Sequence, residues 1–267
     1  MHTTSIQVVQ PDLEVDVSRL EALLEELRPR LRARVDFPDD DADAVAATMS
    51  LLRAMVVQAE AILALARTNI AEAGSSNLRT MFEAWCDLRY ILDEPGRGNN
   101  GRRYRVFGLL ELRDYLAATA TPASSHATEL AEVEAALAPY VAQRPALVDA
   151  TSVERAAKRP PPWAGRNRTR MLRHLTEAPA TPTPAAGTTE AGNDNVLRAL
   201  AWDSRNALQA ALDATIDTDD DGQIRLTFRR RRLPAESGAF YCAMATRMLS
   251  NAWLKFANAF TVVPGTE

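Results

Sequence analysis

The residues of this chain best suited to ligand binding are Arg79 and Glu83, set one helical turn apart. Their neighbours in the predicted helix over 77–92 are strongly apolar, and a buried ionised group must be paired and hydrogen-bonded. Two interpretations are open. Either the pair ties neighbouring helices together, or it joins Tyr104 and Trp163 in a polar pocket that recognises a small anion or a partner's side chains.

Acid–base chemistry near neutral pH usually needs histidine, and the chain has three. They are His2, His126 and His174. No two have the spacing of metal ligands, so no metal site is expected. Arg168 stands six positions before His174, a spacing that resembles HEPN ribonucleases, in which an arginine binds the scissile phosphate and a histidine moves protons. A second fragment, Arg205-Asn206, is similar to the start of that motif, but Ala210 stands where its histidine is expected.

Two charged runs lie close together near the C-terminal end. The stretch 217–222 spaces its aspartates and a glycine like the first half of an EF-hand calcium loop, yet Phe228 replaces the glutamate at the twelfth position. A solvated turn is therefore the favoured interpretation. Arg229–Arg232 could hold phosphate, nucleic acid or an acidic partner, or could be neutralised across a hairpin by Asp219–Asp221.

The composition narrows the class of protein. A net charge of −4 over 267 residues argues against non-specific nucleic-acid binding, and no nucleotide-binding or metalloprotease motif is present. Cys86 and Cys242 lie in apolar surroundings without a disulfide framework, which fits a reducing compartment. Residues 1–10 lack the pattern of a signal peptide, and no apolar run reaches the ~18 residues of a membrane span. A cytoplasmic protein without a membrane partner or cofactor is expected.

Helical periodicity dominates the chain. Helices are predicted at 16–34, 42–73, 77–92, 102–119, 126–143, 146–157, 166–177, 194–215 and 236–260. The helix over 42–73 is apolar most of the way round and should be central, with Gly74 ending it. Residues 95–101 and 178–192 are predicted loops, and the prolines at 160–162 make a stiff link.

The predicted fold class is all-α, a helical bundle with a long central helix. Its core is expected from the helices at 42–73, 77–92, 102–119, 194–215 and 236–260. Residues 224–228 alternate polar and apolar like a strand, so a small β-hairpin or extended arm is predicted near 222–232. The expected organisation is an N-terminal helix over 1–38 and a bundle domain over 39–267.

Three stretches in order resemble the DUF5677 family of bacterial helical proteins of unknown activity. Asn77–Ala84 is similar to the family's R-x-x-x-E-A helix, and Tyr90–Leu92 to the Y-I-L segment that closes it. Arg103–Phe107 resembles its R-Y-x-x-F helix start, and Trp163–Asn167 its W-x-G-[KR]-[SN] entry to a short helix. The stretch 201–206 departs from the family by lacking a histidine. The family supplies no activity, and its kinship with HEPN domains is an analogy of fold.

Two functions follow as hypotheses. The first is a binding or interaction protein that recognises a small anion or an acidic protein partner through Arg79, Glu83, Tyr104 and Trp163, with a homodimer as the expected assembly. The second is a HEPN-like metal-independent ribonuclease or toxin-type enzyme, in which Arg168, His174 and Arg205 converge. RNA is an expected partner only under the second hypothesis.

Overall fold

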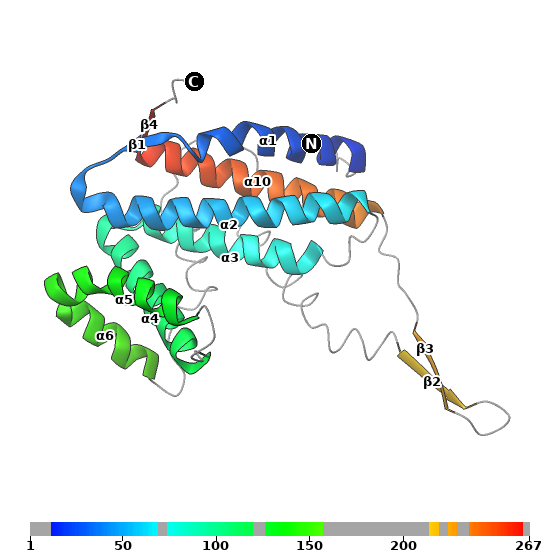
Figure 1. Ribbon diagram of the computed structural model, residues 1–267. Helices are drawn as coiled ribbons and strands as arrows, with labels where there is room; N and C mark the ends of the chain where they lie inside the picture. The colour runs from blue at the N-terminus through cyan, green and yellow to red at the C-terminus, as the bar shows by residue number, and fades with distance from the viewer. Residues whose placement is uncertain are drawn as a thin grey trace, which may run out of the picture.

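The structure is a computed structural model, and it describes residues 12–68, 74–119, 126–156, 214–218, 224–228 and 235–263 (Figure 1). Helices make up almost all of this part of the chain, and its strands form two small antiparallel pairs. The prediction of an all-α helical bundle is therefore confirmed. The predicted helix at 166–177, the predicted loop 178–192 and residues 194–213 of the predicted 194–215 helix lie outside the described residues.

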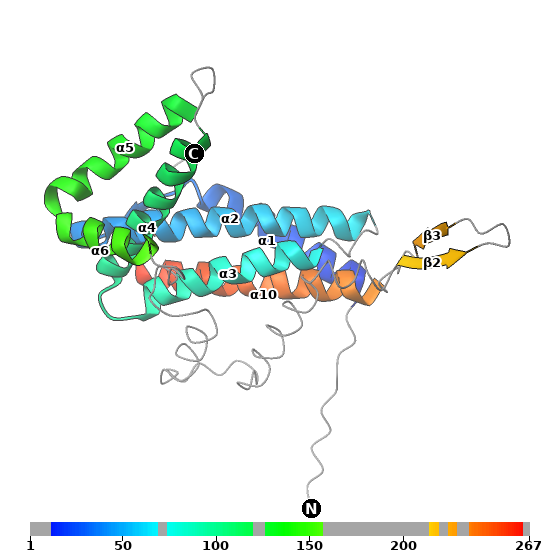
Figure 2. The ribbon, with the colours of Figure 1, turned by 90° about the horizontal axis from the view of Figure 1, so that it is seen from below.

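Four long helices form the main bundle: α1 (Leu13–Arg30), α2 (Ala42–Arg67), α3 (Gly74–Asp93) and α10 (Ala235–Ala259). They run side by side in both views, with α10 packed against each of the other three (Figures 1 and 2). Their shared core is built from fully buried aliphatic and aromatic side chains. The largest are Leu20, Leu24, Leu27, Leu52, Met55, Ile62, Leu78, Met81, Leu88, Ile91 and Phe256.

The sequence of α2 explains its central position. Buried residues are found on several sides of the helix and not on a single stripe, so α2 presents apolar surface to α1, α3 and α10. Contrary to expectation, the segment Asp39–Arg67 is long and apolar enough to cross a membrane by length and composition, and an 18-residue window within it has a mean hydropathy of 1.6. Its apolar side chains pack against the other helices of the bundle, an arrangement compatible with a soluble protein.

A second, smaller unit is formed by α4 (Arg97–Thr119), α5 (His126–Gln143) and α6 (Pro145–Ala156). It stands at one end of the bundle, with α4 crossing the beginning of α2 (Figure 2). This unit has a small core of its own. The core consists of Val106, Leu110, Leu116, Val133 and Leu137.

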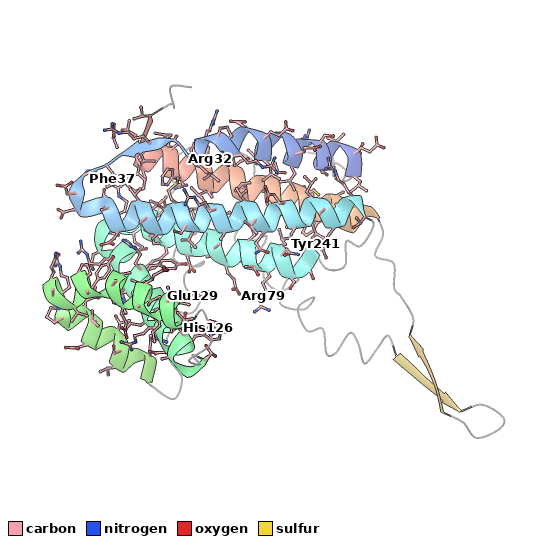
Figure 3. All side chains as sticks on the ribbon, in the orientation of Figure 1. Arg32, Phe37, Arg79, His126, Glu129 and Tyr241 are labelled. Carbon is pink, nitrogen blue, oxygen red and sulfur yellow. The ribbon has the colours of Figure 1, made fainter. Side chains whose placement is uncertain are left out.

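Two helix boundaries predicted at glycine-containing segments differ from those in the structure. The loop predicted over 95–101 is wrong beyond Gly96, because α4 already begins at Arg97 and includes Gly98 and Gly101. These glycines serve a close helix crossing: a Cβ atom on Gly101 would lie 2.3 Å from the Ala44 Cα. Gly74 does not end the preceding helix, which stops at Arg67. It begins α3 instead, where a Cβ atom would lie 2.9 Å from the Tyr241 ring (Figure 3).

The strands form two separate pairs. β1 (Arg34–Asp36) pairs antiparallel with β4 (Thr261–Val263) and closes the end of α1 against the end of α10. β2 (Ala214–Thr218) pairs antiparallel with β3 (Ile224–Phe228), which confirms the predicted strand. The end of the predicted 194–215 helix is wrong, because β-branched residues from Thr215 onward favour the extended conformation.

Candidate functional site

The structure describes three of the four residues of the predicted pocket. Arg79 and Glu83 form an ion pair on α3, with Nε and Oε1 3.3 Å apart, and their side chains are 47% and 31% exposed. Figure 3 shows Arg79 on the outer side of α3. Tyr104 lies on α4, partly buried against the bundle core. Trp163 lies outside the described residues, so the four-residue pocket stays a prediction.

The three residues of the ribonuclease hypothesis, Arg168, His174 and Arg205, also lie outside the described residues. The histidine that the structure places, His126, begins α5, and its Nδ1 atom is 3.4 Å from the Thr119 carbonyl oxygen. Within the described ranges, no three His, Cys, Asp or Glu side chains are grouped closely enough to hold a metal ion.

A polar cluster that the sequence analysis missed lies where the small unit meets the bundle. Asp43, in the first turn of α2, accepts hydrogen bonds from three side chains. Arg102 donates from Nε at 3.2 Å and Arg105 from Nη1 at 2.7 Å, both on α4. The hydroxyl of Tyr140 on α5 donates to the same carboxylate. Asp43 therefore joins α2, α4 and α5 through one carboxylate that is only 15% exposed.

Tyr140 is held in its neutral form at this cluster. Burial raises the pKa of its hydroxyl to about 12, with a further contribution from the hydrogen bond to Asp43. Because a neutral hydroxyl keeps its proton, Tyr140 donates to the carboxylate throughout the physiological range. The Arg105 guanidinium also lies 5.8 Å from the centre of the Tyr140 ring, a cation–π contact.

A second ion pair lies one turn earlier. Arg97, the first residue of α4, donates to Asp41 from Nε at 3.1 Å and from Nη2 at 2.5 Å. Its Nη1 donates to the Ala259 carbonyl oxygen at 3.2 Å, and the guanidinium lies 4.8 Å from the Phe260 ring centre. Arg97 thus binds the start of α2 to the end of α10, and its charge is largely satisfied inside the protein.

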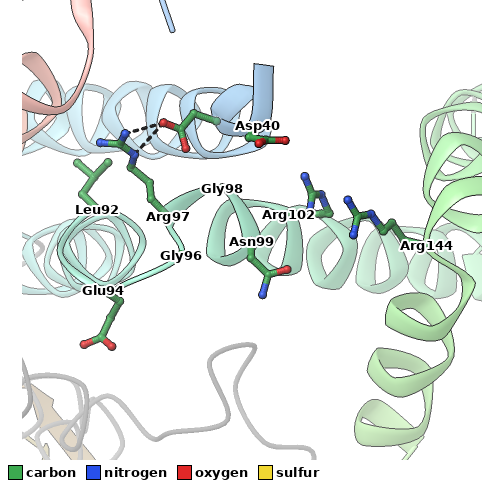
Figure 4. A pocket seen from close by; sticks show the side chains of 10 residues that line it. Asp40, Leu92, Glu94, Gly96, Arg97, Gly98, Asn99, Arg102 and Arg144 are labelled. Atoms are coloured by element: carbon green, nitrogen blue, oxygen red, sulfur yellow. Dashed lines mark hydrogen bonds and ion pairs between the residues drawn. The ribbon is translucent and has the colours of Figure 1, made fainter. Parts of the chain in front are cut away.

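Beside these pairs lies an open pocket of about 650 Å³. Its lining includes arginines, acidic residues and the first turn of α4. The lining residues are Asp40, Asp41, Leu92, Glu94, Gly96, Arg97, Gly98, Asn99, Arg102 and Arg144. Figure 4 shows Arg97 at one end of the pocket, Arg102 and Arg144 at the other, and Asn99 between them.

The end of the pocket at Arg102 and Arg144 is the part available to a ligand. Arg102 donates its Nε–H to Asp43, and its other guanidinium N–H groups have no hydrogen bond to any residue in the described ranges. The exposed Arg144 side chain has no hydrogen bond or ion pair to any residue that the structure describes. The first N–H groups of α4 also lack partners within the helix and carry the positive end of its dipole.

The sequence contained weak signals for this site. The one feature that pointed to a crossing was the pair of glycines, Gly98 and Gly101, three positions apart. Without the path of the chain, nothing placed that pair against Ala44 or set Arg144 beside Arg102.

Comparison with protein-family models, with curated proteins and with solved structures found no match to this chain. The candidate site therefore rests on its own geometry.

Proposed function

We propose that this chain is a non-catalytic helical binding protein of the cytoplasm, and that its pocket between α3, α4 and Arg144 binds a small anionic ligand. The ligand class is a small molecule bearing a carboxylate or phosphate group. The observation that carries the proposal is the position of the Arg144 guanidinium beside Arg102 and the first turn of α4, with no ion pair from Arg144 to any residue that the structure describes.

The chemistry of the donors supports an anion. Guanidinium groups bind carboxylate and phosphate in a planar, bidentate manner, and a helix N-terminus adds N–H donors and positive potential. Asn99 can donate one more hydrogen bond from the middle of the pocket. The pocket volume of about 650 Å³ lies within the range of small-molecule sites.

The acidic residues that line the pocket limit its affinity for an anionic ligand. Asp41 is occupied by Arg97, but Asp40 lines the pocket and repels an anion at close range. Binding is therefore expected to be moderate in affinity and sensitive to salt. The same geometry provides an internal test, since removing the Asp40 charge should strengthen binding whereas removing the Arg144 charge should weaken it.

The test is isothermal titration of the full chain with inorganic phosphate and, separately, with succinate. Arg144→Gln is expected to weaken binding about tenfold, and Asp40→Asn to tighten it several-fold, because each changes one charge beside the ligand. Arg67→Gln is the matched control: it also removes one exposed arginine charge, but at the opposite end of α2 from the pocket.

Binding that responds equally to Arg144→Gln and Arg67→Gln would show a general effect of net charge and contradict the proposal. Failure of the wild-type chain to bind either anion would contradict it as well. The ribonuclease alternative has no supporting observation among the described residues, and it stays a prediction.

A further inference from the structure

The proposed anion pocket contains an acidic group beside its basic ones. Asp40 lies just before α2 and is exposed, and its carboxylate has no hydrogen bond or ion pair to any residue in the described ranges. The other two acidic residues of the lining differ from it. Asp41 pairs with Arg97, and Glu94 already interacts with another residue. Asp40 is therefore the carboxylate of this pocket that is available to a ligand.

The helix crossing fixes where Asp40 lies relative to the arginines. A Cβ atom on Gly98 would lie 2.1 Å from the Asp40 carbonyl oxygen, so the Asp40 backbone lies directly against the first turn of α4. Arg102 follows Gly98 by four positions on the same helix face, where side chains begin about 6 Å apart. Figure 4 shows the Asp40 carboxylate toward the Arg102 end of the pocket. A negative and a positive group therefore line the pocket about one helical turn apart.

This arrangement distinguishes between two kinds of anion. A ligand that carries only negative groups approaches the Asp40 carboxylate when it binds Arg102 and Arg144, and like charges repel. A ligand that also carries an ammonium group can place it at Asp40, so the repulsion is replaced by an attraction. Two opposite unit charges about 4 Å apart in water change an affinity about fivefold. The pocket should therefore favour the second kind of ligand.

We propose that the ligand of this pocket carries an ammonium group as well as its anionic group, and that it is a small amino-carboxylate of the acidic amino-acid type. The inference rests on the proposed function, because the carboxylates of such a ligand need the guanidinium groups of Arg102 and Arg144. The Asn99 amide is a further donor to them. The ammonium group of the ligand donates hydrogen bonds to the Asp40 carboxylate.

Isothermal titration of the full chain with three ligands of one carbon skeleton tests this assignment. Succinate has two carboxylates alone, free aspartate adds an ammonium group, and malate adds an uncharged hydroxyl at the same carbon. The wild-type chain is expected to bind aspartate several-fold more tightly than succinate or malate. Asp40→Asn is expected to tighten the binding of succinate and malate several-fold, but to weaken that of aspartate about fivefold, because it removes the partner of the ammonium group.

Glu25→Gln is the matched control variant. Glu25 is exposed on α1, one turn after Glu21, which pairs with Arg67 at the far end of α2. This substitution also removes one carboxylate charge, but away from the pocket, so it should leave the preference for aspartate over succinate unchanged. A loss of that preference as large as the loss in Asp40→Asn would show a general effect of net charge and overturn the inference.

The other outcomes separate this inference from the function on which it rests. If Asp40→Asn changes the affinities for succinate and aspartate equally, or if the wild-type chain binds malate as tightly as aspartate, the inference is overturned and the anion site stands. If neither succinate nor aspartate binds the wild-type chain, the proposed function is contradicted and the inference fails with it.

Discussion

Asp43 is the residue on which the contact between the two helical units most depends. Its carboxylate accepts from Arg102, Arg105 and Tyr140, and its side chain is 15% exposed. The negative charge of this carboxylate compensates the two guanidinium charges, which would otherwise be poorly solvated. The cluster also sets the position of Arg102, so the pocket proposed to bind an anion depends on a residue that does not line it.

Replacing Asp43 with Asn should lower the free energy of unfolding by about 2 kcal/mol, because two guanidinium groups then lose their counter-charge in a largely buried place. The measurement is urea unfolding followed by circular dichroism. Asp114→Asn is the matched control: Asp114 also pairs with two arginines, Arg113 and Arg155, but is 51% exposed. Its loss should stay below about 1 kcal/mol. Equal losses in the two variants would mean that burial of the Asp43 cluster is unimportant.

At the scale of elements, the decisive feature is how closely α4 approaches the beginning of α2. Gly98 and Gly101 allow the two backbones to meet, and ion pairs flank that contact: Arg97 pairs with Asp41, just before α2, and Arg102 with Asp43 on α2. Helical glycine is normally unfavourable by about 1 kcal/mol relative to alanine. Here that intrinsic cost is offset by a packing arrangement that no larger residue permits.

Two glycine substitutions on α4 should act in opposite directions. Gly101→Ala is expected to destabilise the protein by about 2–3 kcal/mol, because the new Cβ atom meets the Ala44 backbone. Gly108→Ala should stabilise it by about 0.8 kcal/mol, since nothing lies within 4 Å of the new atom and helix propensity improves. Melting temperatures measured side by side give the signs. A Gly101→Ala protein as stable as the wild type would contradict the close crossing.

At the scale of the molecule, the described residues form two cores of unequal size. The bundle core draws on α1, α2, α3 and α10, whereas the α4–α6 unit has only a small cluster around Leu110 and Leu137. α5 packs on α4 and α6, and Tyr140 gives it a hydrogen bond to the bundle. The pocket lies at the junction, with α3 and α4 on one side and Arg144, between α5 and α6, on the other.

Local stability should therefore differ between the two units. In hydrogen exchange, α5 and α6 are expected to exchange faster than α2 and α10, because fewer buried side chains protect them. Leu137→Ala should accelerate exchange in α5 and α6 while leaving α2 unchanged, whereas Leu52→Ala should accelerate exchange throughout the bundle. Uniform acceleration by Leu137→Ala would show that the protein unfolds as one unit.

Local patterns in the sequence were sufficient for most of the elements. Apolar periodicity predicted α2 as the central helix and α3 as a core helix, and the alternation over 224–228 predicted β3, because these signals depend only on residue spacing. Boundaries set by long-range contact were missed. The segment from Arg97 to Gly101 reads as a loop by composition, and only the approach of Ala44 explains why its glycines belong to a helix.

The polar residues also divide into local pairs, which sequence spacing can predict, and long-range contacts, which it cannot. Sequence spacing identified the Arg79–Glu83 pair, since partners one turn apart on a helix are neighbours by geometry. It could not identify the cluster at Asp43, whose partners lie 59, 62 and 97 positions away along the chain. The sequence by itself determined helices, a strand and local pairs. Only the tertiary structure decided which charges meet and where a pocket opens, because those contacts depend on how distant helices cross.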